Sequence, residues 1–144
     1  MVTGSETVTG RPLVAADGEG PLLRLTHPIS LWGGVDPRSG RIVDPRHPQH
    51  GASLAGKVVV LPAAVGSSSS SAIMLELLRE GTAPAGIVMG RADAILALGM
   101  VVGRELGYAP VPVVEAPPEA FRDWEEGASV RISQDGVVEQ VSGA

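Results

Sequence analysis

The residues with the clearest potential for chemistry are five consecutive serines, Ser67 to Ser71, which follow Gly66. They lie between an apolar run at 57–61, typical of a buried strand, and a helical pattern at 72–80. Ligands of open α/β sheets bind at such a place, beyond the carboxyl end of a strand. Because the N–H groups and the dipole of a helix start favour negative charge, and hydroxyls add donors, the run predicts an anion-binding turn.

A structural interpretation of the same serines stays open beside this functional one. Ser69 or Ser70 would cap the helix and the other hydroxyls would belong to a flexible turn, because serine is a preferred N-cap residue. The run is not a nucleotide-binding Walker loop, since neither Gly-Lys-Ser nor Gly-Lys-Thr follows Gly66.

The histidines and acidic residues give a weaker signal. Asp44, His47 and His50 lie in a proline-broken loop, and their spacing does not place them on one face, so we expect no metal site in this chain. A structural or a substrate-facing role remains open for His47. The sequence has no cysteine, which excludes a disulfide, a thiolate nucleophile and a cysteine-held cluster within this chain.

Trp32 stands beside two glycines, Gly33 and Gly34, in the segment 26–37. We expect this segment to be a structured loop, because its glycine pair and its prolines argue against a helix. The indole would either stack on a ligand or anchor the core or an interface, and the sequence leaves both interpretations open.

Composition excludes several classes of protein. At 144 residues, 44% of them hydrophobic, the chain is long and apolar enough for one packed domain. A net charge of −5, with ten arginines and one lysine, argues against nucleic-acid binding and against a polybasic membrane patch. No apolar run approaches about 18 residues and the start of the chain is polar, so we expect no membrane span, no signal peptide and a cytoplasmic protein.

The remaining pattern supplies the elements that must position the candidate residues. Apolar runs predict strands at 21–25, 41–44, 57–61, 85–89 and 111–114, and helical spacing predicts helices at 72–80 and 94–106. Alternation of strand and helix predicts a parallel βαβαβ layer. Asp135-Gly136 predicts an antiparallel hairpin near the end of the chain. The fold class is therefore α/β, a short parallel layer joined by antiparallel strands from both chain ends.

The predicted helix at 94–106 has two different sides. Ile95, Leu98 and Val102 form an apolar row along one of them. Gly99 and Gly103, four residues apart, leave a bare face that can approach another element closely.

Several segments together resemble the small subunit, or swivelling domain, of aconitase X. They are PISLWGGVDP at 28–37, GRIVDPRHP at 40–48, GKVVVLP at 56–62, GTAPAGIV at 81–88 and DAILALG at 93–99. The likeness runs in this order from about residue 10 to 142, and WGGVD and GTAP are specific in combination. The resemblance implies a β/β/α swivelling fold. We place it at 11–144 as a single domain, after a flexible tail at 1–10.

The resemblance also implies an activity, a partner and a cofactor. Known members of the family are dehydratases of cis-3-hydroxy-L-proline or of (R)-5-phosphomevalonate, in which the swivelling domain closes over the active site of a larger aconitase-like subunit. We therefore expect a hydro-lyase subunit that is active only as a heterodimer with a large subunit, on a hydroxy acid such as cis-3-hydroxy-L-proline. The iron–sulfur cluster or iron is expected on the large subunit, with no cofactor held by this chain.

The family's turn, of the type Gly-Arg-Gly-Ser-Ser-Thr-Gly-Ser, gives its first serine the role of proton acceptor. That serine corresponds to Ser67 in this sequence. The further substrate-binding candidates, which flank the cleft or the subunit interface, are Ser68, Ser69, Trp32, Gly33, Gly34 and His47.

This sequence departs from the family's turn chiefly at 64, 65 and 70. Ala64 and Val65 replace the Gly-Arg pair, and Ser70 replaces a glycine. An arginine suited to a substrate carboxylate or phosphate is thus missing from its usual place, which favours a member with a different substrate. Three alternatives stay open: a phosphomevalonate dehydratase small subunit, a non-catalytic anion-binding module of the same fold, and a stand-alone enzyme.

Overall fold

The computed structural model describes residues 7–62, 70–91 and 94–141 of the chain. Its helices are α1 (Leu31–Gly34), α2 (Ser70–Glu80), α3 (Ala94–Glu105) and the 3-10 helix η1 (Pro118–Phe121). Its strands are β1 (Thr7–Thr9), β2 (Arg11–Val14), β3 (Gly18–Arg24), β4 (Val35–Asp36), β5 (Arg41–Ile42), β6 (Val58–Leu61), β7 (Gly86–Met89), β8 (Val113–Glu115), β9 (Ser129–Ile132) and β10 (Val137–Gln140).

Eight of these strands form one mixed sheet in the order β1-β10-β9-β3-β6-β7-β8-β2. β3, β6, β7 and β8 run parallel, whereas β2 at one edge and β9, β10 and β1 at the other are joined through antiparallel pairs. The predicted parallel βαβαβ layer and the predicted hairpin are confirmed. The parallel part is one strand wider than predicted, because β3 joins it beside β6.

β3 connects the two parts of the sheet. Its first residues, Gly18 to Pro21, pair antiparallel with β9, and its last, Leu22 to Arg24, pair parallel with β6. Glycine is needed in the first part, since a Cβ atom at Gly18 would lie 2.0 Å from the carbonyl oxygen of Ala85. Because β3 and β6 are parallel, their carboxyl ends reach the same edge of the sheet.

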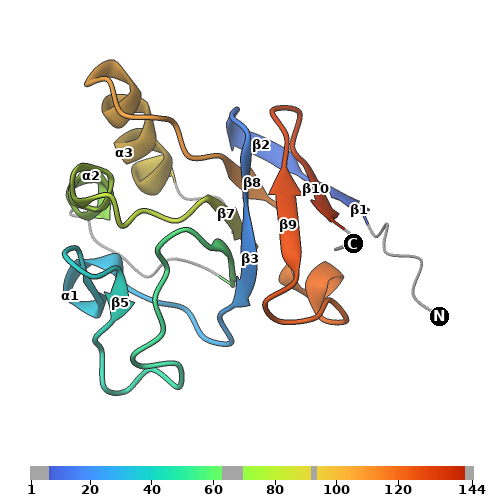
Figure 1. Cartoon of the computed structure of the whole chain (residues 1–144), viewed down its shortest axis with the longest axis horizontal. Helices are drawn as coiled ribbons and strands as arrows, with labels where there is room; N and C mark the ends of the chain where they lie inside the picture. The colour runs from blue at the N-terminus through green and yellow to red at the C-terminus, as the bar shows by residue number, and fades with distance from the viewer. Residues whose placement is uncertain (1–6, 63–69, 92–93, 142–144) are drawn as a thin grey trace.

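The central strands are buried on both faces, which gives the molecule a layered β/β/α architecture. Figure 1 shows the three α-helices on one side of the central strands and the β9–β10 hairpin on the other. Along β6, Val59 and Leu61 pack into an apolar cluster with residues of α2 and α3. Val58 and Val60 pack into a second cluster, under the hairpin and η1. Burial on both faces explains the uninterrupted apolar run of β6.

α2 and α3 pack against each other through the glycines of α3. A Cβ atom at Gly99 would lie 2.9 Å from the carbonyl oxygen of Ser71, and one at Gly103 would lie 2.5 Å from Cδ1 of Leu78. The prediction that this bare face meets another element closely is therefore confirmed. These glycines let the two helices approach closely, which fixes the position of α2 relative to α3.

Two local predictions differ from the structure. Residues 31–34, expected within a loop, form the single helical turn α1, which fits between the prolines that were expected to exclude a helix. Residues 7–9, expected within a flexible tail, form β1 and pair with β10, as their β-branched sequence Thr-Val-Thr favours. Among the described residues, no helix is both long and apolar enough to cross a bilayer.

Candidate functional site

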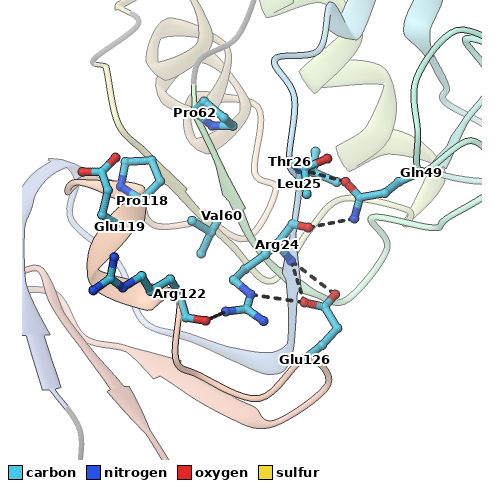
Figure 2. A pocket seen from close by; sticks show the side chains of 10 residues that line it. All are labelled: Arg24, Leu25, Thr26, Gln49, Val60, Pro62, Pro118, Glu119, Arg122 and Glu126. Atoms are coloured by element: carbon cyan, nitrogen blue, oxygen red, sulfur yellow. Dashed lines mark hydrogen bonds and ion pairs between the residues drawn. The ribbon is translucent and has the colours of Figure 1, made fainter.

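A cleft of about 680 Å³ opens at the edge of the sheet where β3 and β6 end. Its lining residues, drawn in Figure 2, are Arg24, Leu25, Thr26, Gln49, Val60, Pro62, Pro118, Glu119, Arg122 and Glu126. We refer to this set as the edge cleft. Its position, beyond the carboxyl ends of parallel strands, is where ligands of open α/β sheets bind.

The edge cleft has a floor and two walls. The floor is formed by the ends of β3 and β6, where Arg24 pairs with Val60. One wall is η1 with the following Arg122, and the other is Gln49 from the loop after β5. Pro62 stands at the end of β6 and leads directly into residues 63–69.

Arg24 is bonded to the η1 wall through its side chain. Its Nη1 donates to the carbonyl oxygens of Phe121, at 2.6 Å, and of Arg122, at 2.5 Å. Its Nε lies 3.5 Å from Oε1 of Glu126, and its main-chain N–H donates to the two oxygens of that carboxylate at 3.1 and 3.3 Å. Figure 2 shows the contacts from Arg122 and from Glu126 converging on Arg24.

Gln49 is bonded to the end of β3 as a further strand would be. Its Nε2 donates to the carbonyl oxygen of Arg24 at 2.7 Å, and its Oε1 accepts from the N–H of Thr26 at 2.9 Å. The side-chain amide thus replaces main-chain pairing on the exposed edge of β3. The η1 wall and the Gln49 wall of the cleft are therefore both hydrogen-bonded to the end of β3.

His47 lies behind Gln49 and does not line the edge cleft. Its side chain is buried, with Nδ1 accepting from the N–H of Gln49 at 3.0 Å and Nε2 3.3 Å from the carbonyl oxygen of His27. Of the two roles left open for this histidine, the geometry supports the structural one. Substrate contact by His47 stays a prediction without support from these contacts.

The glycine pair beside Trp32 lies at a different hollow. Gly33 and Gly34 line it together with Ser30 and residues 44–46, and its volume is about 500 Å³. There the main-chain N–H of Arg46 donates to Asp44 at 3.0 Å and holds the pKa of that carboxyl below its ordinary value. The structure therefore does not bring this pair into the edge cleft.

The side chains of the remaining predicted site residues lie outside the part of the chain that the structure describes. Ser67, Ser68 and Ser69 lie outside the described residues, as do Ala64 and Val65. Trp32 belongs to α1, but the structure places only its main chain. Their assigned roles remain predictions. What the structure adds is that Pro62, five residues before the serine run in the sequence, lines the edge cleft.

Sequence reasoning missed Arg24, Gln49 and Glu126. Arg24 carried a usable signal, since it lies next to the last residue of the strand predicted at 21–25, at the edge where ligands bind. Gln49 and Glu126 carried none, because each meets Arg24 only through the fold. The charged lining residues comprise two arginines and two glutamates, so the edge cleft is electrically balanced.

A metal centre has no obvious ligand set in the described part of the chain. Across residues 7–62, 70–91 and 94–141, no three His, Asp or Glu side chains group closely enough to hold a metal ion. The balanced edge cleft suits a polar organic ligand better than a bare cation.

Comparison with known proteins gives this geometry a context. The aconitase X swivel domain family matches residues 7–140. The cis-3-hydroxy-L-proline dehydratase of Pseudomonas aeruginosa is 42% identical over 106 residues, which cover 74% of this chain and 18% of that protein. The phosphomevalonate dehydratase small subunit of Methanothermobacter thermautotrophicus is 38% identical over 126 residues, which cover 87% of this chain and 92% of that protein.

Solved structures show the same arrangement. The chain superposes on Thermococcus kodakaraensis aconitase X in its holo-form with a TM-score of 0.83 and 30% identity, covering 95% of this chain and 99% of that one. A solution NMR structure of a UPF0107 protein gives a TM-score of 0.82 with 27% identity, covering 95% and 100%. The chain spans less than a quarter of the hydroxyproline dehydratases that it matches, 18% and 22%. Family match, sequence identity and superposition agree, and the chain belongs to the aconitase X swivel domain family.

Proposed function

We propose that this chain is the small subunit of an aconitase X-type dehydratase and that it acts on a hydroxy acid, cis-3-hydroxy-L-proline, in a heterodimer with a large subunit. The observation that carries the proposal is the edge cleft, which opens beside Pro62 at the start of the segment that holds the serine run. A swivelling domain that closes over a partner's active site would present this edge to the substrate.

Dehydration removes a proton from carbon and expels hydroxide from a neighbouring carbon. An iron centre on the large subunit would act as a Lewis acid that makes hydroxide a better leaving group. The contribution of this chain is the base, which must be held close to the C–H bond. In the proposal that base is Oγ of Ser67, and Ser68 and Ser69 contact the substrate or the main chain beside it.

A serine is a weak base in water, so its oxygen needs positive surroundings to accept a proton. α2 begins at Ser70, three residues after the proposed base, and its amino end supplies N–H groups and a dipole. Such a helix end contributes only about 0.3–2 kcal/mol. The remaining stabilisation is assigned to the large subunit, which explains why neither chain is expected to work alone.

The choice of cis-3-hydroxy-L-proline rests on charge and on the sequence itself. Phosphomevalonate carries a phosphate and a carboxylate, whereas hydroxyproline carries one carboxylate and an ammonium group. Val65 stands where the family's turn has an arginine, and the edge cleft carries equal numbers of arginines and glutamates. One cation fewer in an electrically balanced site suits the less anionic substrate. Ten arginines against one lysine also resemble a GC-rich bacterial protein.

The phosphomevalonate dehydratase small subunit is the second candidate. It is favoured by chain architecture, because the Methanothermobacter relative is a separate small subunit of which this chain covers 92%. An assay of the assembled heterodimer with both substrates separates the two candidates. We expect turnover of cis-3-hydroxy-L-proline and none of phosphomevalonate by the same preparation.

The experiment co-expresses this chain with an aconitase X-type large subunit, expected from the neighbouring gene, and measures product after anaerobic reconstitution. Each chain alone is the control, and we expect activity only from the pair. Turnover by the isolated chain, or turnover of phosphomevalonate alone, would contradict the assignment.

A further inference from the structure

Both walls of the edge cleft are bonded to the same residue, Arg24, at the carboxyl end of β3. Its guanidinium holds the carbonyl groups of Phe121 and Arg122, and its own carbonyl group holds the amide of Gln49. Arg24 side-chain exposure is 27%, so the guanidinium is largely covered by the groups that it binds.

The η1 wall is held by hydrogen bonds for which a guanidinium group is well suited. The two carbonyl oxygens come from consecutive residues at the end of η1, and one Nη1 atom lies 2.6 and 2.5 Å from them. Positive charge is favourable at the carboxyl end of a helical turn. The planar guanidinium also brings Nε to 3.5 Å from Glu126, whereas a lysine has a single point of charge and no fixed fork.

The opposite wall is held through the main chain of Arg24. Gln49 bonds the strand on both sides of Leu25, at the carbonyl of Arg24 and at the N–H of Thr26. The main-chain N–H of Arg24, on the same edge of the strand, is bonded to Glu126. A displacement of the Arg24 main chain therefore moves Gln49 as well as η1.

We propose that Arg24 is the positioning residue that sets the spacing between the η1 wall and the Gln49 wall, and through it the affinity for substrate. The proposal rests on the proposed function for the identity of the ligand. Arg24 acts through the carbonyl groups of residues 121 and 122 and through Gln49, and the reacting atoms lie elsewhere. Its replacement is therefore expected to raise KM and to leave kcat nearly unchanged.

The first test measures the walls directly, in the full chain without a partner. In the Arg24→Lys variant we expect the carbonyl carbon resonances of Phe121 and Arg122 to move, because an ammonium group cannot reproduce the position and the fork of the guanidinium. Arg131→Lys is the matched control, since Arg131 pairs with Glu139 on the β9–β10 hairpin and not in the edge cleft. Unchanged carbonyl resonances in Arg24→Lys would overturn the proposal.

The second test uses the assembled heterodimer. For Arg24→Lys we expect KM for cis-3-hydroxy-L-proline to rise about tenfold, with kcat within about twofold of the unmodified enzyme. In Arg24→Ala, guanidinium ion at low, non-denaturing concentration is expected to restore part of the affinity. Displaced carbonyl resonances with an unchanged KM would show that the wall spacing does not govern binding.

The two tests separate this proposal from the proposed function. If the unmodified heterodimer turns over neither substrate, the proposed function fails. The carbonyl resonances of the full chain then still decide whether Arg24 fixes the walls. If the unmodified enzyme is active and both Arg24 variants match it in KM, the positioning role is wrong and the proposed function stands.

Discussion

At the scale of single residues, His47 is defined by the bonds of its two ring nitrogens. Nδ1 accepts from the N–H of Gln49, so the proton of the neutral ring is on Nε2, which donates to the carbonyl of His27. The ring thereby ties the loop that carries Gln49 to the chain leaving β3. A histidine so placed contributes to the shape of the edge cleft through its neighbour.

Replacing this histidine should weaken the fold. His47→Ala removes a buried ring and leaves the N–H of Gln49 without its acceptor, at an expected cost of about 1–3 kcal/mol in the free energy of unfolding. Urea denaturation followed by circular dichroism measures the loss. His50→Ala is the control in the same loop, because His50 is exposed, and its effect should stay within about 0.5 kcal/mol. Equal stabilities of the two variants would contradict the structural role of His47.

At the scale of elements, the contact between α2 and α3 depends on the missing side chains of two glycines. At Gly99 an added methyl group would meet main-chain atoms of Ser71, whereas at Gly103 it would meet the end of the Leu78 side chain. A side chain can change rotamer, but a helix main chain can only shift as a whole. Gly103 should therefore tolerate an added methyl group better than Gly99.

This difference predicts opposite outcomes for two similar variants. Gly99→Ala should lower the free energy of unfolding by about 1–3 kcal/mol, because α2 must move away from α3. Gly103→Ala should be close to neutral, since the alanine's gain in helix propensity offsets the movement of Leu78. Thermal unfolding of both variants makes the comparison. A more destabilising Gly103→Ala would show that the helices are not packed as described.

The β9–β10 hairpin carries a carboxylate that responds to pH. Ser133 Oγ donates to Asp135 in the turn, and this bond holds the pKa of Asp135 below its ordinary value of 3.8. A lowered pKa stabilises the folded state above the unfolded-state value, and the stabilisation is lost as pH falls through the folded value. The relevant range therefore lies below pH 3.8.

Ser133→Ala tests this coupling. Without the hydroxyl, the pKa of Asp135 should rise toward 3.8, and stability should depend less steeply on pH in the acid range. An NMR titration of the Asp135 carboxyl carbon measures the shift. Identical titration curves for the two proteins would mean that the hydroxyl does not hold the carboxylate.

At the scale of the whole molecule, sequence patterns predicted the parallel layer well because each of its strands and helices is signalled by residues close together in the chain. β6 is a continuous apolar run, and the helices beside it show their spacing within a few turns. At the sheet edges, sequence predicted antiparallel strands from both chain ends but not which strands pair, since β1 pairs with β10 and joins Thr7 to Glu139. β3 was expected as a strand, but its double role depends on partners from different parts of the chain.

In the candidate site too, sequence predicts the parts that are local in the chain and not the parts that form only in the fold. The serine run is visible in sequence because strand, turn and helix follow one another, and the family resemblance directs attention to Ser67. The frame around the edge cleft is not visible, because residues 24, 49 and 126 meet only after the sheet and the loops have formed. Sequence thus points to the proposed base, and the fold supplies the walls of the edge cleft.

The central claim is that this chain lends a serine base to a larger partner, and one measurement tests it most directly. Turnover of cis-3-hydroxy-L-proline is compared between heterodimers that carry Ser67→Ala and Ser129→Ala, an exposed serine of β9. We expect Ser67→Ala to lower kcat by about 10²–10⁴-fold while the heterodimer still assembles, and Ser129→Ala to have no effect. Full turnover by an assembled Ser67→Ala enzyme would contradict the central claim.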